Sequence, residues 1–395
     1  MRTKIRQMAE AVKQDLFAFT RQLIATPSFS GKEGGVIQYL KMEMVKSGYE
    51  RVWVDDFGNL LGIIGTGERL IALDGHCDTV GIGNPESWLW DPFLGNHQDG
   101  IIYGRGAADQ KGGLAAALFA GKIVKEIGLP ANTSLLVVAS VLEEDAEGLC
   151  WKYIIEEDKI KPHAMLLTEP SSLGIMIGQR GRMEIKIQTT GISCHGSAPE
   201  QGDNAIYKIL PIIQEIEELN NTLSSTSMLG KGTIAVTDIR SSAPSLCAIP
   251  DNAIIHLDRR LSEGETLETV QEELSKLPAV QKSAARITVP ENTIQTYTRL
   301  KYPVKAYYPL WLMNSTHPLV QTAVSAYQNQ FAEKAGLGVW QFSTNGVATR
   351  GVFNIPTIGF GPGSEKYAHT SMDQVNENDL VKALEFYVAF IYEWS

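Results

Sequence analysis

The feature that most constrains the fold of this chain is a nearly continuous apolar run at residues 134–142, followed at once by Glu143 and Glu144. An apolar run without alternation is typical of a strand buried on both faces of a sheet. Such a strand rarely ends in two like charges unless a cation or a reacting group lies beyond it. Three other segments lead from a strand-like run into polar side chains: residues 70–75 into His76 and Asp78, 164–167 into Glu169, and 103–106 into Asp109. The sequence therefore predicts an α/β sheet with an active site at the carboxyl ends of its strands.

The pattern of apolar residues changes twice along the chain. Helical spacing at residues 5–25 and 35–47, a small-residue helix that begins at Gly112, and the buried strands alternate as in an α/β domain. From residue 182 the strands alternate apolar and polar positions, and the order of elements becomes β-α-β-β-α-β. After residue 309 the buried pattern resumes, with helices at 317–334 and 377–393.

A chain of 395 residues is long for one hydrophobic core, which favours two domains. We predict a discontinuous α/β domain with a mostly parallel sheet, which binds metal and carries out catalysis, at residues 1–181 plus 306–395. An α+β domain of the βαββαβ, ferredoxin-like type is predicted as an insertion at residues 182–305, where it would act as a lid and as a dimer surface.

Composition excludes several classes of partner. The net charge of −10, without a cluster of Lys and Arg, argues against nucleic acid. No stretch approaches the roughly 18 apolar residues that span a bilayer, and the charged amino terminus lacks an apolar signal core. The four cysteines are scattered and form no CxxC pair. We therefore expect a reduced, cytoplasmic protein with no membrane partner and no thiolate metal site.

The polar side chains after the strands are hard metal ligands. The set contains two imidazoles and several carboxylates but no thiolate, which suits Zn²⁺ in a catalytic site; its members are His76, Asp78, Asp109, Glu143, Glu144, Glu169 and His369. So many carboxylates cannot all ionise together without the charge of about two divalent ions. Two metals bridged by one carboxylate would activate a shared water, while one of the adjacent glutamates ligates and the other acts as base.

The motifs around these residues resemble one family of enzymes. They are His76-Cys-Asp78, Trp90-Asp-Pro-Phe93, the glycine-rich segment 103–113 around Asp109, Glu143-Glu144, Thr168-Glu169-Pro170, Gly191-Ile-Ser-Cys-His195-Gly, Asn204-Ala-Ile, Asp258-Arg-Arg260 and Ala368-His369. In order and spacing they are similar to the acetylornithine deacetylase, succinyl-diaminopimelate desuccinylase and aminoacylase family of M20-type metallopeptidases. Residues 148–162 and 191–200 resemble a subgroup called selenium-metabolism-linked hydrolases, a name that fixes no substrate.

The resemblance implies roles for the metal-binding residues. His76 and Glu169 would hold one Zn²⁺, and Glu144 and His369 would hold the other, with Asp109 as the bridge. Co²⁺ or Mn²⁺ could substitute. Asp78 would orient His76, Glu143 would be the general base, and the peptide bond after Asp109 would be cis.

The resemblance also implies a substrate subsite. His195 would stabilise the oxyanion, in some relatives in the neighbouring subunit's site, while Arg260 and Asn204 would contact the carboxylate side of the substrate. The backbone of Gly361 and Gly363 would lie near the same group. The chain departs from the family twice: residues 344–350 lack an aspartate, and Met372-Asp373-Gln374 stands where a glutamate usually follows His369.

Simpler interpretations compete with some of these roles. Glu143 and Glu144 could be an acidic pair at a helix start, His369 and His195 could be solvated, and Arg260 could merely pair with Asp258. We predict a hydrolase that cleaves the amide of an N-acyl amino acid or small peptide-like substrate, as a homodimer through the inserted domain. The alternatives are a dipeptidase, an N-carbamoyl amidohydrolase, against which Glu169 argues because those relatives carry histidine there, and a non-catalytic binding protein.

Overall fold

The largest element of the fold is a mixed sheet, here called the main sheet. A computed structural model describes residues 1–223, 225–226 and 228–394. The strand order is β1-β2-β6-β3-β7-β20-β8-β18, with β19 paired to β8. The strands β6, β3, β7 and β20 are parallel, while the pairs β1–β2, β2–β6, β20–β8 and β8–β18 are antiparallel and β19 runs parallel to β8. The bounds are β1 (Arg51–Val54), β2 (Leu60–Ile64), β3 (Arg69–His76), β6 (Thr133–Ser140), β7 (Ala164–Leu167), β8 (Ile175–Gln179), β18 (Trp311–Leu312), β19 (Leu337–Trp340) and β20 (Thr357–Gly359).

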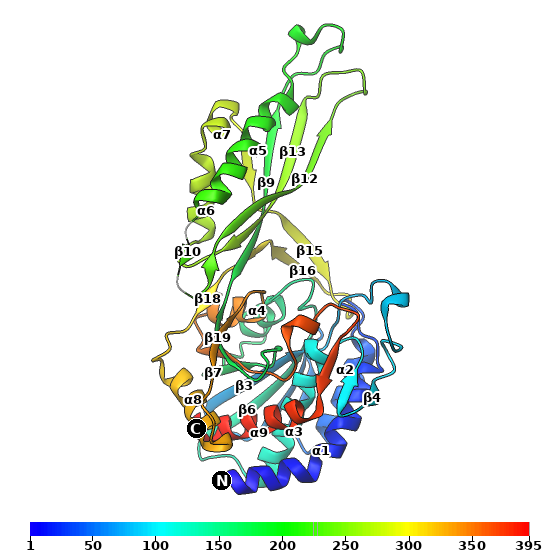
Figure 1. Cartoon of the computed structure of the whole chain (residues 1–395), viewed down its shortest axis with the longest axis vertical. Coiled ribbons are helices and arrows are strands. Elements are labelled where there is room, and N and C mark those ends of the chain that lie inside the picture. Colours follow the sequence, from blue (N-terminus) through cyan, green and yellow to red (C-terminus); the bar gives the residue numbers. More distant parts are fainter. Residues whose placement is uncertain (224, 227, 395) are drawn as a thin grey trace.

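Helices cover the main sheet and share its hydrophobic core. The helices α1 (Arg2–Ile24), α3 (Gly112–Ile127), α8 (Pro318–Phe331) and α9 (Glu377–Trp394) pack on one another, and α3 and α8 contact the strands (Figure 1). The helix α2 (Gly34–Lys46) lies against β1 and β2, and α4 (Leu149–Glu156) carries the buried Trp151. The small side chains of residues 115–117 let α3 approach β3 and β6 closely, as the sequence predicts.

A second, smaller sheet stands above the main sheet in Figure 1. Its order is β12-β13-β9-β14, all antiparallel, and β17 also pairs with β9. The bounds of these elements are β9 (Gly181–Thr190), β12 (Thr233–Ser242), β13 (Asn252–Leu261), β14 (Arg286–Thr288) and β17 (Tyr307–Tyr308). Three helices accompany them: α5 (Ala205–Thr222), α6 (Leu267–Ser275) and α7 (Pro278–Ser283). We call these elements together the small-sheet unit.

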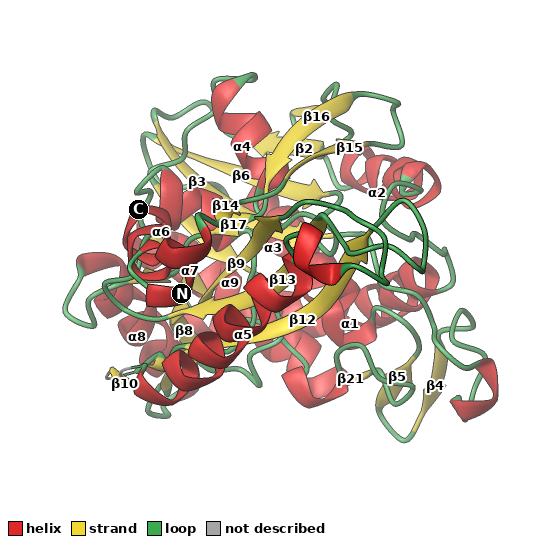
Figure 2. Ribbon diagram, turned by 90° about the horizontal axis from the view of Figure 1, so that it is seen from above, coloured by secondary structure: helices red, strands yellow, loops and turns green. Residues whose placement is uncertain are grey.

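The small-sheet unit has its own hydrophobic cluster. Alternate residues of β9, among them Ile185 and Ile187, are fully buried and face Ile209 and Ile212 of α5. Figure 2 shows α5 lying along β12 and β13, in agreement with its contacts. The period-two pattern of the sequence therefore corresponds to a sheet with one face covered by helices.

Short strands complete the fold. A three-stranded sheet contains β4 (Asn96–Gln98), β5 (Ile101–Tyr103) and β21 (Gln374–Asn376). The hairpins are β10 (Ser225–Thr226) with β11 (Gly230–Lys231), and β15 (Glu291–Gln295) with β16 (Lys301–Lys305). The second hairpin packs Ile294 and Val304 against the core of the main sheet. The predicted domain boundaries at 182 and 305 stay a prediction. The chain crosses from the main sheet to the second sheet between β8 and β9, and it enters the main sheet again between β17 and β18.

Two local expectations are wrong. The strand predicted at 134–142 ends at Ser140, because the chain turns at Leu142, whose φ is 59°. Residues 103–106 do not lead Asp109 out of the main sheet, since β5 pairs with β4 and β21. Asp109 instead lies in the kinked turn η2 (Ala107–Lys111) immediately before α3, where its own φ of −122° and ψ of 95° are not helical.

Candidate metal centre

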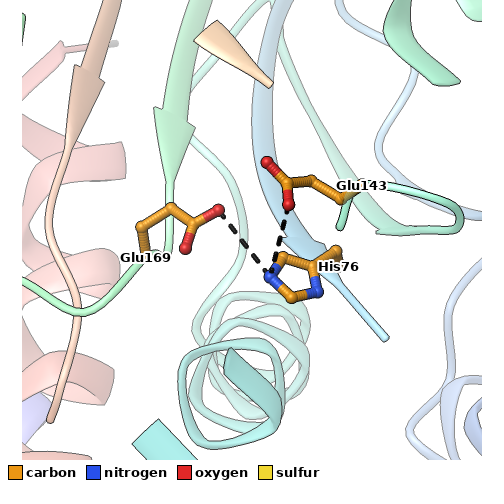
Figure 3. Close-up of side chains that lie close together, drawn as sticks. All are labelled: His76, Glu143 and Glu169. Carbon is orange, nitrogen blue, oxygen red and sulfur yellow. Dashed lines mark ion pairs between the residues drawn. The ribbon is translucent and has the colours of Figure 1, made fainter. Parts of the chain in front are cut away.

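The strands β3, β6 and β7 bring three polar side chains to one edge of the main sheet. His76 is the last residue of β3, Glu169 follows the end of β7, and Glu143 lies in the turn after β6. Because β3 lies between β6 and β7, His76 is flanked by both carboxylates (Figure 3). His76 Nε2 lies 3.9 Å from Glu143 Oε2 and 3.9 Å from Glu169 Oε1.

Asp109 and His369 complete the cluster from outside the sheet. The Asp109 carboxylate lies between two imidazoles, with Oδ1 3.0 Å from His76 Nε2 and Oδ2 3.4 Å from His369 Nε2. His369 Nε2 is also 2.9 Å from Glu144 Oε2. The peptide bond between Asp109 and Gln110 is cis, as the resemblance implies.

The charges in this cluster call for a cation. Burial, reinforced by Glu169, raises the pKa of the Glu143 carboxyl well above its ordinary value, and burial does the same for Glu169. Burial lowers the pKa of the His76 imidazole, but its hydrogen bond to Asp109 and the nearby carboxylates outweigh this and raise that pKa well above its usual range. Its hydrogen bonds to carboxylates, Asp109 foremost, raise the pKa of His369 to about 10. The carboxylates outnumber the imidazoles, so positive charge is required to ionise them together.

The donor atoms fit divalent cations. The ligand atoms of His76, Glu143 and Glu169 lie within 4.8 Å of one another, and so do those of His76, Asp109 and Glu144. Glu143 Oε1 is buried and has no hydrogen-bond partner among the residues that the structure describes. A buried carboxylate oxygen without a donor is costly unless a cation or a reacting group meets it.

Asp78 supports the turn that carries the adjacent glutamates. Its Oδ1 accepts the backbone N–H of Glu143 and its Oδ2 that of Glu144, both at 3.2 Å. The Ser30 hydroxyl donates to the same carboxylate at 2.7 Å. His76 Nδ1 lies 3.0 Å from the main-chain oxygen of Asp78 and 3.6 Å from Oδ1. Asp78 thus contacts His76 chiefly through its backbone.

A cavity of about 360 Å³ opens beside the cluster. Its wall includes Arg182 of β9 and Arg260 of β13, which are direct partners across the two antiparallel strands. Arg260 donates to Asp258 at 2.8 Å, and Arg182 Nη2 lies 3.4 Å from Glu147 Oε2. The small-sheet unit therefore places two guanidinium groups over the metal-binding residues.

Four predicted residues are not among those that line the cavity. His195 is exposed and hydrogen-bonded through Nδ1 to the Ser197 hydroxyl, outside the residues that line the cavity. The Asn204 side chain accepts the N–H of Ile206 and caps α5. Gly361 lies so close to the backbone of the Thr168–Glu169 segment that a Cβ there would be 2.3 Å from two carbonyl oxygens. Gly363, at φ +81°, faces Ala108.

The cavity also contains residues that sequence reasoning missed. They are Glu147, Arg182, Phe342, Ser343 and Glu365. Glu147 follows Glu144 by three residues in the same turn. A third acidic residue so close to the paired glutamates could have indicated from sequence that Glu147 lies in the cavity. Arg182 shows no local signal, because its place in the cavity depends on how the two sheets sit together.

The chain is similar in sequence and in fold to several known proteins. The chain is 44% identical to the uncharacterized protein YgeY of Escherichia coli (strain K12) over 390 residues, which cover 99% of this chain and 97% of YgeY. It is 27% identical over 262 residues to succinyl-diaminopimelate desuccinylase 2 of Ruegeria sp. (strain TM1040), covering 63% of this chain and 66% of that protein. Its fold is similar to that of the Bacillus subtilis YXEP protein, a dinuclear metal-binding peptidase from the M20 family, with a TM-score of 0.69, 14% identity, and 97% and 98% of the two chains covered.

Two imidazoles and four carboxylates at the carboxyl edge of an α/β sheet, beneath a cavity with cationic walls, define a metal-dependent hydrolase. The chain belongs to peptidase family M20/M25/M40, whose model matches residues 72–393. It is accordingly a metal-binding enzyme that hydrolyses amide bonds. In the part of the chain that the structure describes, no helix is both long and apolar enough to cross a bilayer.

Proposed function

We propose that this enzyme uses two Zn²⁺ ions to hydrolyse the amide bond of an N-acyl amino acid or a small peptide-like substrate. His76 and Glu169 would hold one ion, Glu144 and His369 the other, and Asp109 would bridge them. The observation that carries the proposal is the Asp109 carboxylate, whose two oxygens face the imidazoles of His76 and His369. Imidazole and carboxylate ligands without thiolate are typical of catalytic zinc. Co²⁺ or Mn²⁺ would suit the same donors.

The chain's own residues would move the proton. When bound, a pair of divalent ions supplies a water of lowered pKa and polarises the amide carbonyl. Glu143 lies beside the cavity, and its Oε1 is buried without a hydrogen-bond partner among the described residues; it would take the proton from that water and pass it to the leaving nitrogen. Asp78 would keep Glu143 in place by accepting its backbone N–H.

The residues in the cavity wall suggest how the substrate is oriented, with its carboxylate near Arg260. Asp258 accepts hydrogen bonds from Arg260 Nε at 2.8 Å and from Nη2 at 3.4 Å, which holds the guanidinium in the wall of the cavity, where it could receive a substrate carboxylate. Such a placement leaves the amide between Arg260 and the metal-binding residues. A small molecule with a carboxylate near the scissile amide fits this arrangement.

We further propose a homodimer through the small-sheet unit. Its edge strand β12 is largely exposed, and large apolar side chains lie open to solvent on the same unit: Ile192, Tyr207, Leu210, Ile239 and Leu246. Exposed apolar patches and unpaired strand edges are common at protein interfaces. His195, which lies outside the cavity of its own chain, would then reach the cavity of the partner and stabilise the oxyanion.

A complementation assay would test this arrangement. His195→Ala and Glu143→Ala chains, each inactive alone, should regain up to about a quarter of the activity when mixed subunits exchange, since some mixed dimers then hold one intact site. Failure of mixed dimers to recover activity would remove His195 from the partner's site. Light scattering would report the oligomeric state directly. We also propose a cytoplasmic location, because all four cysteines are free thiols.

The chemical proposal has its own test. Glu143→Gln should lower kcat by a factor of 10² to 10⁴ with little change in metal content, because it removes only the proton carrier. Metal analysis should give two ions per chain. A panel of N-acetyl, N-succinyl and N-carbamoyl amino acids and dipeptides would identify the substrate class. Turnover of dipeptides alone would make the enzyme a dipeptidase, and full activity of the Glu143 variant would overturn the base assignment.

A further inference from the structure

The turn that carries Glu143 and Glu144 is hydrogen-bonded to side chains from distant parts of the chain. Four successive backbone N–H groups, those of residues 141–144, donate to side-chain oxygens. The acceptors are Asn59 Oδ1 for Val141 at 3.2 Å, Glu33 Oε1 for Leu142 at 3.1 Å, and the two Asp78 oxygens for Glu143 and Glu144. No strand or helix ladder holds this turn at these positions, since β6 ends at Ser140 and α4 begins at Leu149.

Glu33 is an unusual acceptor because it is fully buried. Its exposed fraction is 0%, and its Oε2 has no hydrogen-bond partner among the described residues. Its Oε1 accepts the N–H of Gly31 at 2.9 Å besides that of Leu142. Burial, with the charge of Asp78 next, raises the pKa of this carboxyl to about 7. A buried carboxyl of this kind is costly and is retained where its acceptor oxygen is needed.

A local role for Glu33 does not account for its burial. It stands immediately before α2, yet its side chain makes no cap hydrogen bond to that helix. Its long-range partner is Leu142, 109 residues further along the chain. Leu142 has a φ of 59°, a conformation that a branched apolar residue adopts only when its surroundings impose it. Glu33 supplies that constraint directly before the general base.

We infer that Glu33 is a positioning residue for Glu143: by accepting the Leu142 N–H it fixes the turn that aims the Glu143 carboxylate at the cavity. The inference rests on the proposed role of Glu143. Glu33 is neither one of the proposed metal ligands nor one of the residues that line the cavity. Asn59 also holds the turn, by accepting the backbone N–H of Val141. Asp78 holds it by accepting the backbone N–H groups of Glu143 and Glu144.

Substitutions at Glu33 separate this role from general stability. Glu33→Gln keeps the acceptor oxygen and should retain kcat within about threefold. Glu33→Ala should lower kcat by about 10- to 100-fold while KM changes less than threefold, because misplacing a catalytic group by about an ångström costs that much. In Glu33→Asp the side chain is too short to reach Leu142, so this variant should behave like the alanine variant. It replaces the alanine variant in the test if the alanine variant does not fold.

A matched control comes from α8. Gln330 is as buried as Glu33 and makes a single strong side-chain bond, to Glu385, far from the cavity. Gln330→Ala should lower Tm without lowering kcat. Equal losses of kcat in Gln330→Ala and Glu33→Ala would mean that Glu33 acts only on stability.

A double-mutant cycle gives the decisive readout. In a chain that already carries Glu143→Gln, adding Glu33→Asp should lower the residual kcat by less than threefold, because the general base that Glu33 would position is no longer present. Additive losses would overturn the positioning role. If Glu143→Gln is itself fully active, the proposed function fails; if it is inactive while Glu33→Ala and Glu33→Asp keep full kcat, only the present inference fails.

Discussion

Asp373 and Arg105 form a fully buried ion pair, in which Arg105 Nη1 lies 3.0 Å from Asp373 Oδ2. The same carboxylate accepts the backbone N–H groups of Gly106 at 2.7 Å and Ala108 at 2.8 Å. These contacts shape the loop that ends at Asp109. Asp373 lies four residues after His369, in the place where the family usually has a glutamate, so the departure in sequence preserves an acidic side chain next to the metal centre.

Removing the Asp373 carboxylate should therefore damage both stability and metal binding. Asp373→Ala leaves the Arg105 charge buried and unpaired, which costs about 3–5 kcal/mol of unfolding free energy. It should also weaken metal affinity by about 10- to 100-fold, because the Asp109 loop loses two anchors. Denaturant unfolding and a competitive metal titration measure the two effects. The exposed Asp238→Ala serves as control, with a change within about 0.5 kcal/mol. Unchanged metal affinity in Asp373→Ala would contradict the expectation.

The two proposed ions should differ in how readily they leave. The side chain of His76 is 1% exposed, whereas that of His369 is 53% exposed. An ion held by Glu144 and His369 is therefore more accessible to a chelator than one held by His76 and Glu169. Limited chelation followed by metal analysis should show one equivalent lost first, with loss of activity, and a second lost later. His369→Ala should hold one equivalent from the start. Simultaneous loss of both ions from the unmodified enzyme would rule out this order.

The part of the site that follows buried strands could be predicted from sequence. His76, Glu169 and Glu143 each come after an apolar run, and parallel neighbouring strands necessarily bring their carboxyl ends to one edge. The alternation of β9 and β13 likewise reflects a sheet with one covered face. In both cases a local pattern determines where the side chain lies.

The remaining parts depend on contacts that no local pattern encodes. Asp109 comes from the kinked turn before α3 and His369 from a loop, so the strand pattern does not place them. Their residue types marked both as possible ligands, but their separate roles came from the motif resemblance. The contact between Arg182 and Glu147 joins the small-sheet unit to the turn after β6. The buried Glu33 stands in an ordinary polar stretch, and its partner lies 109 residues away. Pairings of this kind are set by the packing of whole elements.

Substitution of Gly361 tests how tightly the chain packs against Glu169, a proposed metal ligand. A Cβ at this position would lie 2.3 Å from the carbonyl oxygens of Thr168 and Glu169, and backbone atoms cannot yield as a flexible side chain can. Gly361→Ala should therefore cost about 1–3 kcal/mol and displace Glu169, lowering metal affinity. Gly81→Ala is the control, because nothing lies within 4 Å of its Cβ. Thermal unfolding and metal titration would compare the two, and equal behaviour would show that the Glu169 segment is free to shift.

A pair of acids outside the candidate metal-binding cluster should contribute to the pH dependence of stability. The Asp55 carboxylate accepts the backbone N–H groups of Gly58 and Asn59 and the Asn59 side-chain amide. The negative charge of the nearby Asp158 carboxylate opposes ionisation of Asp55. Burial raises the pKa of Asp55 to about 7, although the bond to Asn59 opposes the shift. Burial also raises the pKa of Asp158.

The sign of the effect follows from proton linkage. A carboxyl whose pKa is raised on folding binds its proton more tightly in the folded state, so the stability it contributes is complete below about pH 4 and is lost as the pH rises through 7. In Asp158→Asn the side-chain amide carries no charge, and its N–H can donate to the Asp55 carboxylate when Asp55 is ionised. Between pH 5 and 7.5 the unmodified protein should therefore lose about 1–2 kcal/mol more unfolding free energy than the variant. Urea unfolding at both pH values measures this difference, in which the common contribution of the metal-site carboxylates cancels. The exposed neighbour Asp56→Asn should behave like the unmodified protein. Parallel pH profiles for Asp158→Asn and the unmodified chain would mean that Asp158 does not influence the ionisation of Asp55.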